Sequence, residues 1–316
     1  MALKQVMSRI AQSLVVLFIL SFLVFSLAHL VPGDLVKTLV GNRKITENVR
    51  AAITSQYHLD EPVFLQYLHW LGKAVRGDFG TSIRSQVPVM TLLYERTPLT
   101  LILTMMAFAI ALLIGIPLGI YAARRTGKAA DRMIVGWAVV GISAPGFALG
   151  LILLYVFSVM LGWFPIYGTG ESLLDTLWHL TLPALALAVG VCAMIIRVTR
   201  ASVSYENTQD YVTFAHSRGC EPARIRSLIM KNAAIPIMTS AGLILGTLFG
   251  STILVEQTFA LPGLGQLLAD SITFKDIPVV QAIVLLVAAV IVITTLLVDI
   301  SVLIVDPSTS QRRTKL

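Results

Sequence analysis

The sequence predicts an all-α polytopic membrane protein with six transmembrane helices. Its 316 residues are 56% hydrophobic and only 13% charged, whereas a soluble domain averages about 25% charged. Long apolar segments recur along the chain, each near the ~20 residues that a helix needs to cross a bilayer. Basic residues gather between these segments, so the net charge of +7 reports membrane topology. A nucleic-acid-binding face would instead combine a basic surface with interleaved aromatic side chains.

The first predicted transmembrane helix lies within residues 1–33. Lys4 and Arg9 precede an apolar run over residues 10–31, and Pro32 ends it. The alternative, a signal peptide, has a shorter apolar core followed by a small-residue cleavage site. We therefore expect an uncleaved helix with its N-terminus in the cytoplasm.

Residues 34–98 are polar and mixed, and they predict a small extracytoplasmic insertion between the first two membrane helices. Within the insertion, residues 47–57 and 63–75 have helical patterns. The second stretch repeats apolar residues at helical spacing, at Phe64, Tyr67, Leu68 and Leu71. A lid that packs on the membrane helices and a direct contact with substrate are both compatible with this segment.

Residues 99–305 predict one continuous membrane domain, followed by a cytoplasmic tail at 306–316. Its five helices are expected at about 99–122, 134–161, 177–196, 237–255 and 279–304.

Two features of this domain bear on packing. Gly115 and Gly119 lie four residues apart, a spacing that permits close helix packing. The run Ser143–Gly146 contains Pro145 and is expected to kink or break the third membrane helix. A broken helix that lines a cavity within the membrane and a plain kinked packing helix both remain open.

The distribution of basic residues predicts the orientation. Fifteen Lys and Arg fall in the N-terminus, the loops after the second and fourth membrane helices, and the tail, whereas the two short outer loops carry only Lys275. Short cytoplasmic loops are enriched in Lys and Arg. Both termini are therefore expected in the cytoplasm.

The longest polar passage in the second half of the chain is residues 207–236. Tyr211, Phe214 and Ala215 recur at the spacing of one helix face, and Asp210 lies at the start of the helix, where an acidic residue complements the helix dipole. Gly219 and the following Pro222 predict its end. We expect a short helix outside the bilayer whose aromatic face has no partner in its own chain.

Residues of this loop resemble the cytoplasmic loop of binding-protein-dependent ABC importer permeases. The matching residues are Asp210, Tyr211, Val212, Ala215, Arg218, Gly219, Asn232, Ala233 and Pro236. The general family signature begins Glu-Ala-Ala, with Gly four residues after the last Ala. The chain keeps Ala215 and Gly219 but has Thr213 and Phe214 in place of the Glu and the first Ala. The peptide and nickel branch of the family shares that departure.

Further stretches resemble the same branch. They are residues 57–62, 77–82, 256–259, 261–265 and 276–281.

The resemblance implies a type I ABC importer permease fold, with residues 99–305 as the translocation domain. It implies a coupling helix that docks on the ATPase, made of Asp210, Tyr211, Phe214, Ala215, Arg218 and Gly219. Tyr211 and Phe214 are the expected anchors.

The partners that the resemblance implies are a second homologous permease in a heterodimer, two ABC ATPase subunits and an extracytoplasmic solute-binding protein, all at the cell inner membrane. The implied function is import of di- or oligopeptides by alternating access. Close relatives carry nickel or metallophore chelates or glutathione, so these cargoes stay open.

The sequence lacks residues that are typical of several other functions. The chain has no G-x-x-x-x-G-K-[ST] phosphate loop, so ATP hydrolysis is expected in separate subunits, and neither enzymatic activity nor a cofactor is expected. Its five histidines show no metal-ligand spacing, and Cys192 and Cys220 offer no disulfide framework. A secondary transporter would need ionisable residues at mid-membrane. A sensory membrane subunit stays possible.

Overall fold

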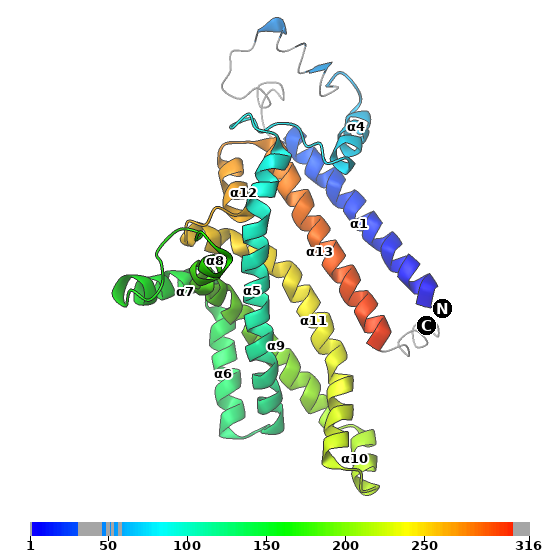
Figure 1. The fold of residues 1–316 in the computed structure, drawn as a ribbon. Helices are drawn as coiled ribbons and strands as arrows, with labels where there is room; N and C mark the ends of the chain where they lie inside the picture. Colours follow the sequence, from blue (N-terminus) through cyan, green and yellow to red (C-terminus); the bar gives the residue numbers. More distant parts are fainter. Residues whose placement is uncertain (1, 31–45, 49–50, 52–53, 56–58, 306–316) are drawn as a thin grey trace. The chain divides into compact units, whose positions relative to one another are not determined.

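The computed structural model describes residues 2–30, 46–48, 51, 54–55 and 59–305, and this part of the chain consists of helices, turns and one isolated bridge (Figure 1). Among these described residues, five helices are long and apolar enough to cross a membrane, and there are six if one bent pair counts as a span. The predicted all-helical membrane fold is confirmed. The chain divides into two compact units, which are described separately.

One unit comprises Ile10–Thr100 and Pro262–Val292. It holds most of α1 (Ala2–Leu30), all of α4 (Val63–Val75) and α12 (Leu264–Thr273), the start of α5 (Val89–Arg124) and the first half of α13 (Ile277–Val305). α4 has the bounds that the sequence predicts. The predicted helix at 47–57 lies largely outside the described residues.

Helix α4 packs on α1 through Tyr67, which is fully buried. Its ring meets Phe18 and Phe22 edge-on, at centroid distances of 5.6 and 5.2 Å. Its hydroxyl shares a 2.7 Å hydrogen bond with Ser21. Because a buried tyrosine hydroxyl requires such a partner, these contacts favour the packing role for this part of the insertion.

Asp276 joins two distant stretches of the same unit. Its buried carboxylate accepts hydrogen bonds from the Ser82 hydroxyl and, at 3.0 and 3.3 Å, from the backbone N–H groups of Ile83 and Arg84. The Arg84 guanidinium lies 3.7 Å from the centroid of the Phe274 ring. Residues 77–82 and 276–281, singled out separately in the sequence, therefore meet at one carboxylate.

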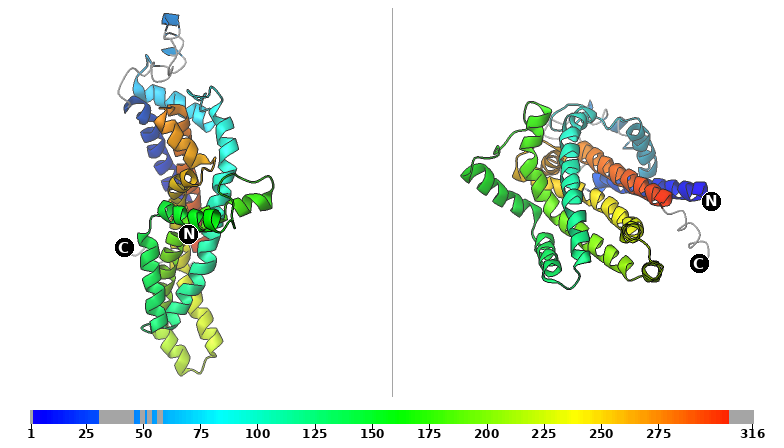
Figure 2. Two further views of the ribbon diagram at one scale, coloured as in Figure 1. Left: turned by 90° about the vertical axis from the view of Figure 1, so that its left-hand side faces the viewer. Right: turned by 60° about the horizontal axis from the view of Figure 1, so that its bottom comes forward.

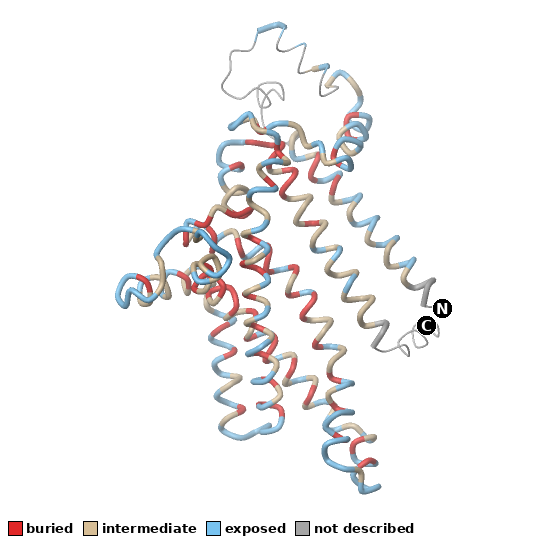
Figure 3. The backbone as a smooth tube through the Cα atoms, viewed as in Figure 1, coloured by how far each residue is buried: buried red, intermediate tan, exposed pale blue. Residues whose placement is uncertain are grey.

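The other unit contains Leu101–Leu261 with Met1–Arg9 and Ile293–Leu316. Its helices include α6 (Ala129–Ser143), α7 (Gly146–Leu153), the π-helix η1 (Leu154–Met160), α8 (Leu173–His179), α9 (Thr181–Asn207), α10 (Asp210–Ser217) and α11 (Pro222–Thr258). Helix α9 contacts α6, α7 and α11 (Figure 2). In its most apolar stretch 56% of the residues are buried, the highest share among the candidate spans. Figure 3 colours the buried residues red.

The close packing predicted at Gly115 and Gly119 is confirmed, and the partner is α9. A Cβ added at Gly115 would lie 2.8 Å from Cγ2 of Ile195, and one at Gly119 would lie 2.6 Å from Cβ of Thr199. At Gly119 the backbone oxygen of Ile196 is also only 2.9 Å away. Glycine at these positions lets the backbones of α5 and α9 approach each other closely.

Several predicted helix bounds were wrong. The second membrane helix begins at Val89, ten residues before the expected start, because Val89 and Leu93 pack in an apolar cluster with Val279 and Ile283. The fifth is part of the longer helix α11, which begins at Pro222 and passes through Pro236 without ending. A proline is tolerated in a membrane helix when neighbouring groups satisfy the freed backbone.

The third membrane helix breaks where the sequence predicts a kink or break, and the fourth begins later than predicted. α6 and the α7–η1 segment meet at an angle of 99°, a far sharper break than a kink, with Pro145 in extended backbone at its start. Helix α8 is separate from α9, which begins at Thr181 rather than at 177. Helix α12 lies within the last predicted outer loop, where no helix was expected.

We expect Gly119→Ala to destabilise the protein by about 1–3 kcal/mol, because the added methyl group meets a backbone oxygen that has little room to move. Gly136→Ala is the matched control, since a Cβ there meets nothing within 4 Å. Thermal unfolding of the purified chain in detergent measures the difference. Equal melting temperatures for the two variants would contradict the close contact.

Candidate functional site

Helix α10 lies in the polar loop, close to the bounds that the sequence predicts. It runs from Asp210 to Ser217, with Gln209 in extended backbone at its N-terminus. Gly219 has φ of +69° and ends the helix, since this left-handed conformation favours glycine. Pro222 then starts α11, at a position where its missing N–H costs nothing.

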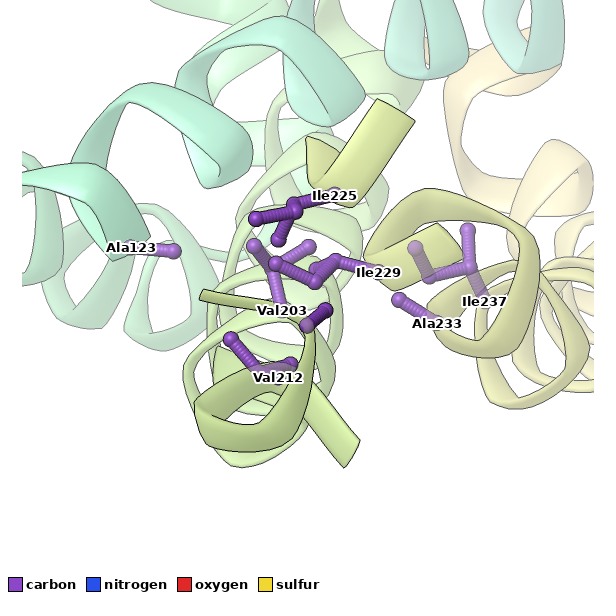
Figure 4. Close-up of a cluster of buried hydrophobic side chains, with 8 residues drawn as sticks. Ala123, Val203, Val212, Ile225, Ile229, Ala233 and Ile237 are labelled. Atoms are coloured by element: carbon purple, nitrogen blue, oxygen red, sulfur yellow. The ribbon is translucent and has the colours of Figure 1, made fainter. Parts of the chain in front are cut away.

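One face of α10 is buried against its own chain. Val212 and Ala215 are 6% and 9% exposed and share an apolar cluster with Val203 of α9 and with Ile225 and Ile229 of α11 (Figure 4). The expectation that the helix has no partner in its own chain is therefore wrong for this face. The cluster fixes α10 to the ends of α9 and α11.

Tyr211 flanks this cluster rather than facing away from it. Its hydroxyl donates a 2.8 Å hydrogen bond to Glu206 at the end of α9, and its ring packs against the buried residues. Burial and then the Glu206 carboxylate raise the pKa of the Tyr211 phenol. Tyr211 therefore contributes to the fold of the loop, which corrects its expected place on a free aromatic face.

The opposite side of the helix is open. Asp210, Phe214 and Arg218 are all exposed and recur every four residues, so they form one stripe, here called the outer face. Phe214 is 58% exposed. The Arg218 guanidinium lies 4.3 Å from the centroid of the Phe214 ring, and this stacking presents the aromatic ring and the charge together. Of the two expected anchors, only Phe214 lies on this face.

Sequence reasoning missed an ion pair that connects the first turn of α6 to α9. Asp131, 3% exposed, accepts hydrogen bonds from Nε and, at 2.7 Å, from Nη2 of Arg200. The backbone N–H of Gly127 adds a third, at 2.9 Å. The available signal was that Asp131 is the one acidic residue in an otherwise basic loop. Beside it, the hydroxyls of Thr126 and Ser204 lie 3.2 Å apart.

No group of three or more His, Cys, Asp or Glu side chains that could hold a metal ion occurs among the described residues. We call the following set the loop site: the buried face of α10, the outer face of α10 and the Asp131–Arg200 ion pair. These features suit the contact surface of a partner protein.

Comparison with known proteins identifies the family. The family described as "binding-protein-dependent transport system inner membrane component" matches residues 115–311. The family of the N-terminal part of such membrane components matches residues 2–104. The chain belongs to this family and is a multi-pass inner membrane protein with the fold of an ABC importer permease.

Two curated relatives match nearly the whole chain. The oligopeptide transport system permease AppB of Bacillus subtilis is 37% identical over 309 residues, covering 96% of this chain and 98% of the relative. The glutathione transport system permease GsiC of Escherichia coli K12 is 38% identical over 310 residues, covering 97% and 98%. A solved chain of the inward-facing MetNI methionine ABC transporter shares the fold, with a TM-score of 0.54 and 20% identity over 69% of this chain and 97% of that chain.

We expect Asp131→Asn to destabilise the protein by about 2 kcal/mol, because it leaves Arg200 without its charged partner. The cost is moderated by water, since the Arg200 side chain is 30% exposed. The double variant Asp131→Asn, Arg200→Gln should recover part of that loss. Thermal unfolding of Asp131→Asn, of the single variant Arg200→Gln and of the double variant closes the double-mutant cycle, and strictly additive effects would contradict a direct interaction.

Proposed function

We propose that this chain is the translocation subunit of an ATP-driven importer that carries di- or oligopeptides into the cell by alternating access. The observation that carries the proposal is the outer face of α10, exposed on a helix that is itself packed against α9 and α11. The relatives named for oligopeptide and glutathione transport support the cargo. Glutathione, itself a tripeptide, is the second candidate cargo.

The outer face has the composition of a protein-docking site. Exposed aromatic and arginine side chains dominate the affinity of many interfaces, and Phe214 and Arg218 supply both. In this proposal two ABC ATPase subunits supply the energy, and one of them receives α10 in a groove. Because Val212 and Ala215 are buried between α9 and α11, movement of α10 is passed to both helices.

The remaining partners follow from the same proposal. A solute-binding protein delivers the cargo outside, and a second, homologous permease completes the pathway. The basic loops favour cytoplasmic termini. Arg9 of α1 and Asp299 of α13 form an ion pair at 3.2 Å. This contact supports placing both ends of the chain on the same side of the membrane.

Copurification tests this assembly. The tagged chain, extracted in mild detergent, should bring with it two ABC ATPase subunits and a second permease, identified by mass spectrometry. Recovery of the chain alone through several detergents would contradict the proposal and favour a self-contained transporter or a sensor.

We expect Phe214→Asp to reduce ATPase recovery at least tenfold, because a carboxylate replaces the aromatic ring at the centre of the outer face. Tyr94→Ala is the matched control, since Tyr94 is 71% exposed but lies outside the loop. Tyr211→Phe, which removes the hydroxyl that bonds Glu206 and Asn232 but keeps the packed ring, should retain the ATPase. Unchanged ATPase recovery with Phe214→Asp would rule out docking through this face.

A further inference from the structure

A groove of about 750 Å³ lies between α6, α9 and α11. Its walls are mainly apolar, with Ile142, Met194 and Leu243 among the lining residues. The polar groups in it are two arginines of α9, Arg197 and Arg200, and the hydroxyls of Ser240 and Thr247 on α11. Arg197 precedes the end of α9 by ten residues, or roughly 15 Å of helix.

The two arginines differ in their electrostatic state. The guanidinium of Arg200 is bound to Asp131, which neutralises it. Arg197 is exposed and has no ion pair within the described part of the chain, and no acidic residue lines the groove. The groove therefore presents one positive charge without an internal counter-ion.

Arg197 lies just past the predicted inner end of the fourth membrane helix, and its uncompensated charge attracts anions into the groove. The planar guanidinium of arginine binds a carboxylate through two parallel hydrogen bonds. Every peptide with a free C-terminus carries a carboxylate, whatever its side chains. The apolar walls suit peptide side chains of varied size. Recognition by the groove therefore requires only the C-terminal carboxylate of the peptide.

We propose that Arg197 binds the carboxylate of the peptide cargo as it crosses, which makes this groove part of the transport pathway. The inference rests on the proposed function, because it assumes that peptide is the cargo. It adds a binding residue and the chemical group that this residue recognises. A phospholipid headgroup is the competing anion, and the experiment below separates the two.

The test measures whether the groove contains water and prefers anions. Ser240→Cys, in a chain with Cys192→Ser and Cys220→Ser, places one thiol in the groove. The copurified assembly in phosphatidylcholine vesicles is treated with two methanethiosulfonate reagents, one carrying a sulfonate and one a trimethylammonium group. Each rate is divided by that of free cysteine. Thr247→Cys repeats the measurement if Ser240→Cys does not assemble.

We expect the sulfonate reagent to be favoured about tenfold, since one fixed charge concentrates counter-ions in a confined site. Arg197→Gln should abolish the preference and Arg197→Lys should keep it. Arg124→Gln is the matched control, because Arg124 is exposed and does not line the groove. A tripeptide with a free C-terminus should slow labelling, whereas its C-terminal amide should not.

Three results would overturn the inference. The thiol could resist both reagents, which means that a helix or lipid fills the groove. The charge preference could be absent, or disappear when phosphatidylglycerol is added without peptide, which assigns Arg197 to lipid. The amide could protect as well as the acid. ATP-dependent peptide uptake by the same vesicles is measured in parallel, so that failure of the proposed function is seen separately.

Discussion

The packing of neighbouring helices against α9 is the constraint on which the rest of this permease unit depends. Gly115 and Gly119 of α5, and Gly141 of α6, each lie where a side chain would press on α9. In a membrane, helix association relies on such close van der Waals contact, because lipid chains are as apolar as the helix surface. Close contact at small residues therefore stabilises the helix packing here, whereas burial of apolar surface from water does so in soluble proteins. α9 is held from several sides as a result.

The same helix connects the loop site to the proposed pathway. α9 carries Arg197 in the groove and Arg200 in the ion pair with Asp131, and Val203 in the cluster beneath α10. A rigid helix with these three attachments moves as one body. In this account, a push on the outer face of α10 shifts the groove without a separate signalling element. In this account, function depends on the movement of connected helices and not on a chemical reaction catalysed by this chain.

The sequence predicted the order of the membrane helices but not all their bounds, because long apolar segments separated by basic loops are typical of membrane-spanning helices while helix ends depend on packing. It predicted α10 within a residue or so at each end, and Phe214 as an exposed aromatic residue. It misplaced Tyr211, because spacing alone does not distinguish a face that packs on its own chain from one that stays free. Pro145 indicated a kink or break before α7 but not its 99° angle. The Asp131–Arg200 pair joins residues far apart in the sequence, which no local pattern records.

The most direct test of the account is the energy source of peptide uptake. The copurified assembly is reconstituted in vesicles, and uptake of a labelled tripeptide is followed with ATP inside or outside, and with or without the solute-binding protein. The account predicts uptake only when ATP is on the α10 side and binding protein is on the other. Uptake driven by a proton gradient without ATP would contradict it.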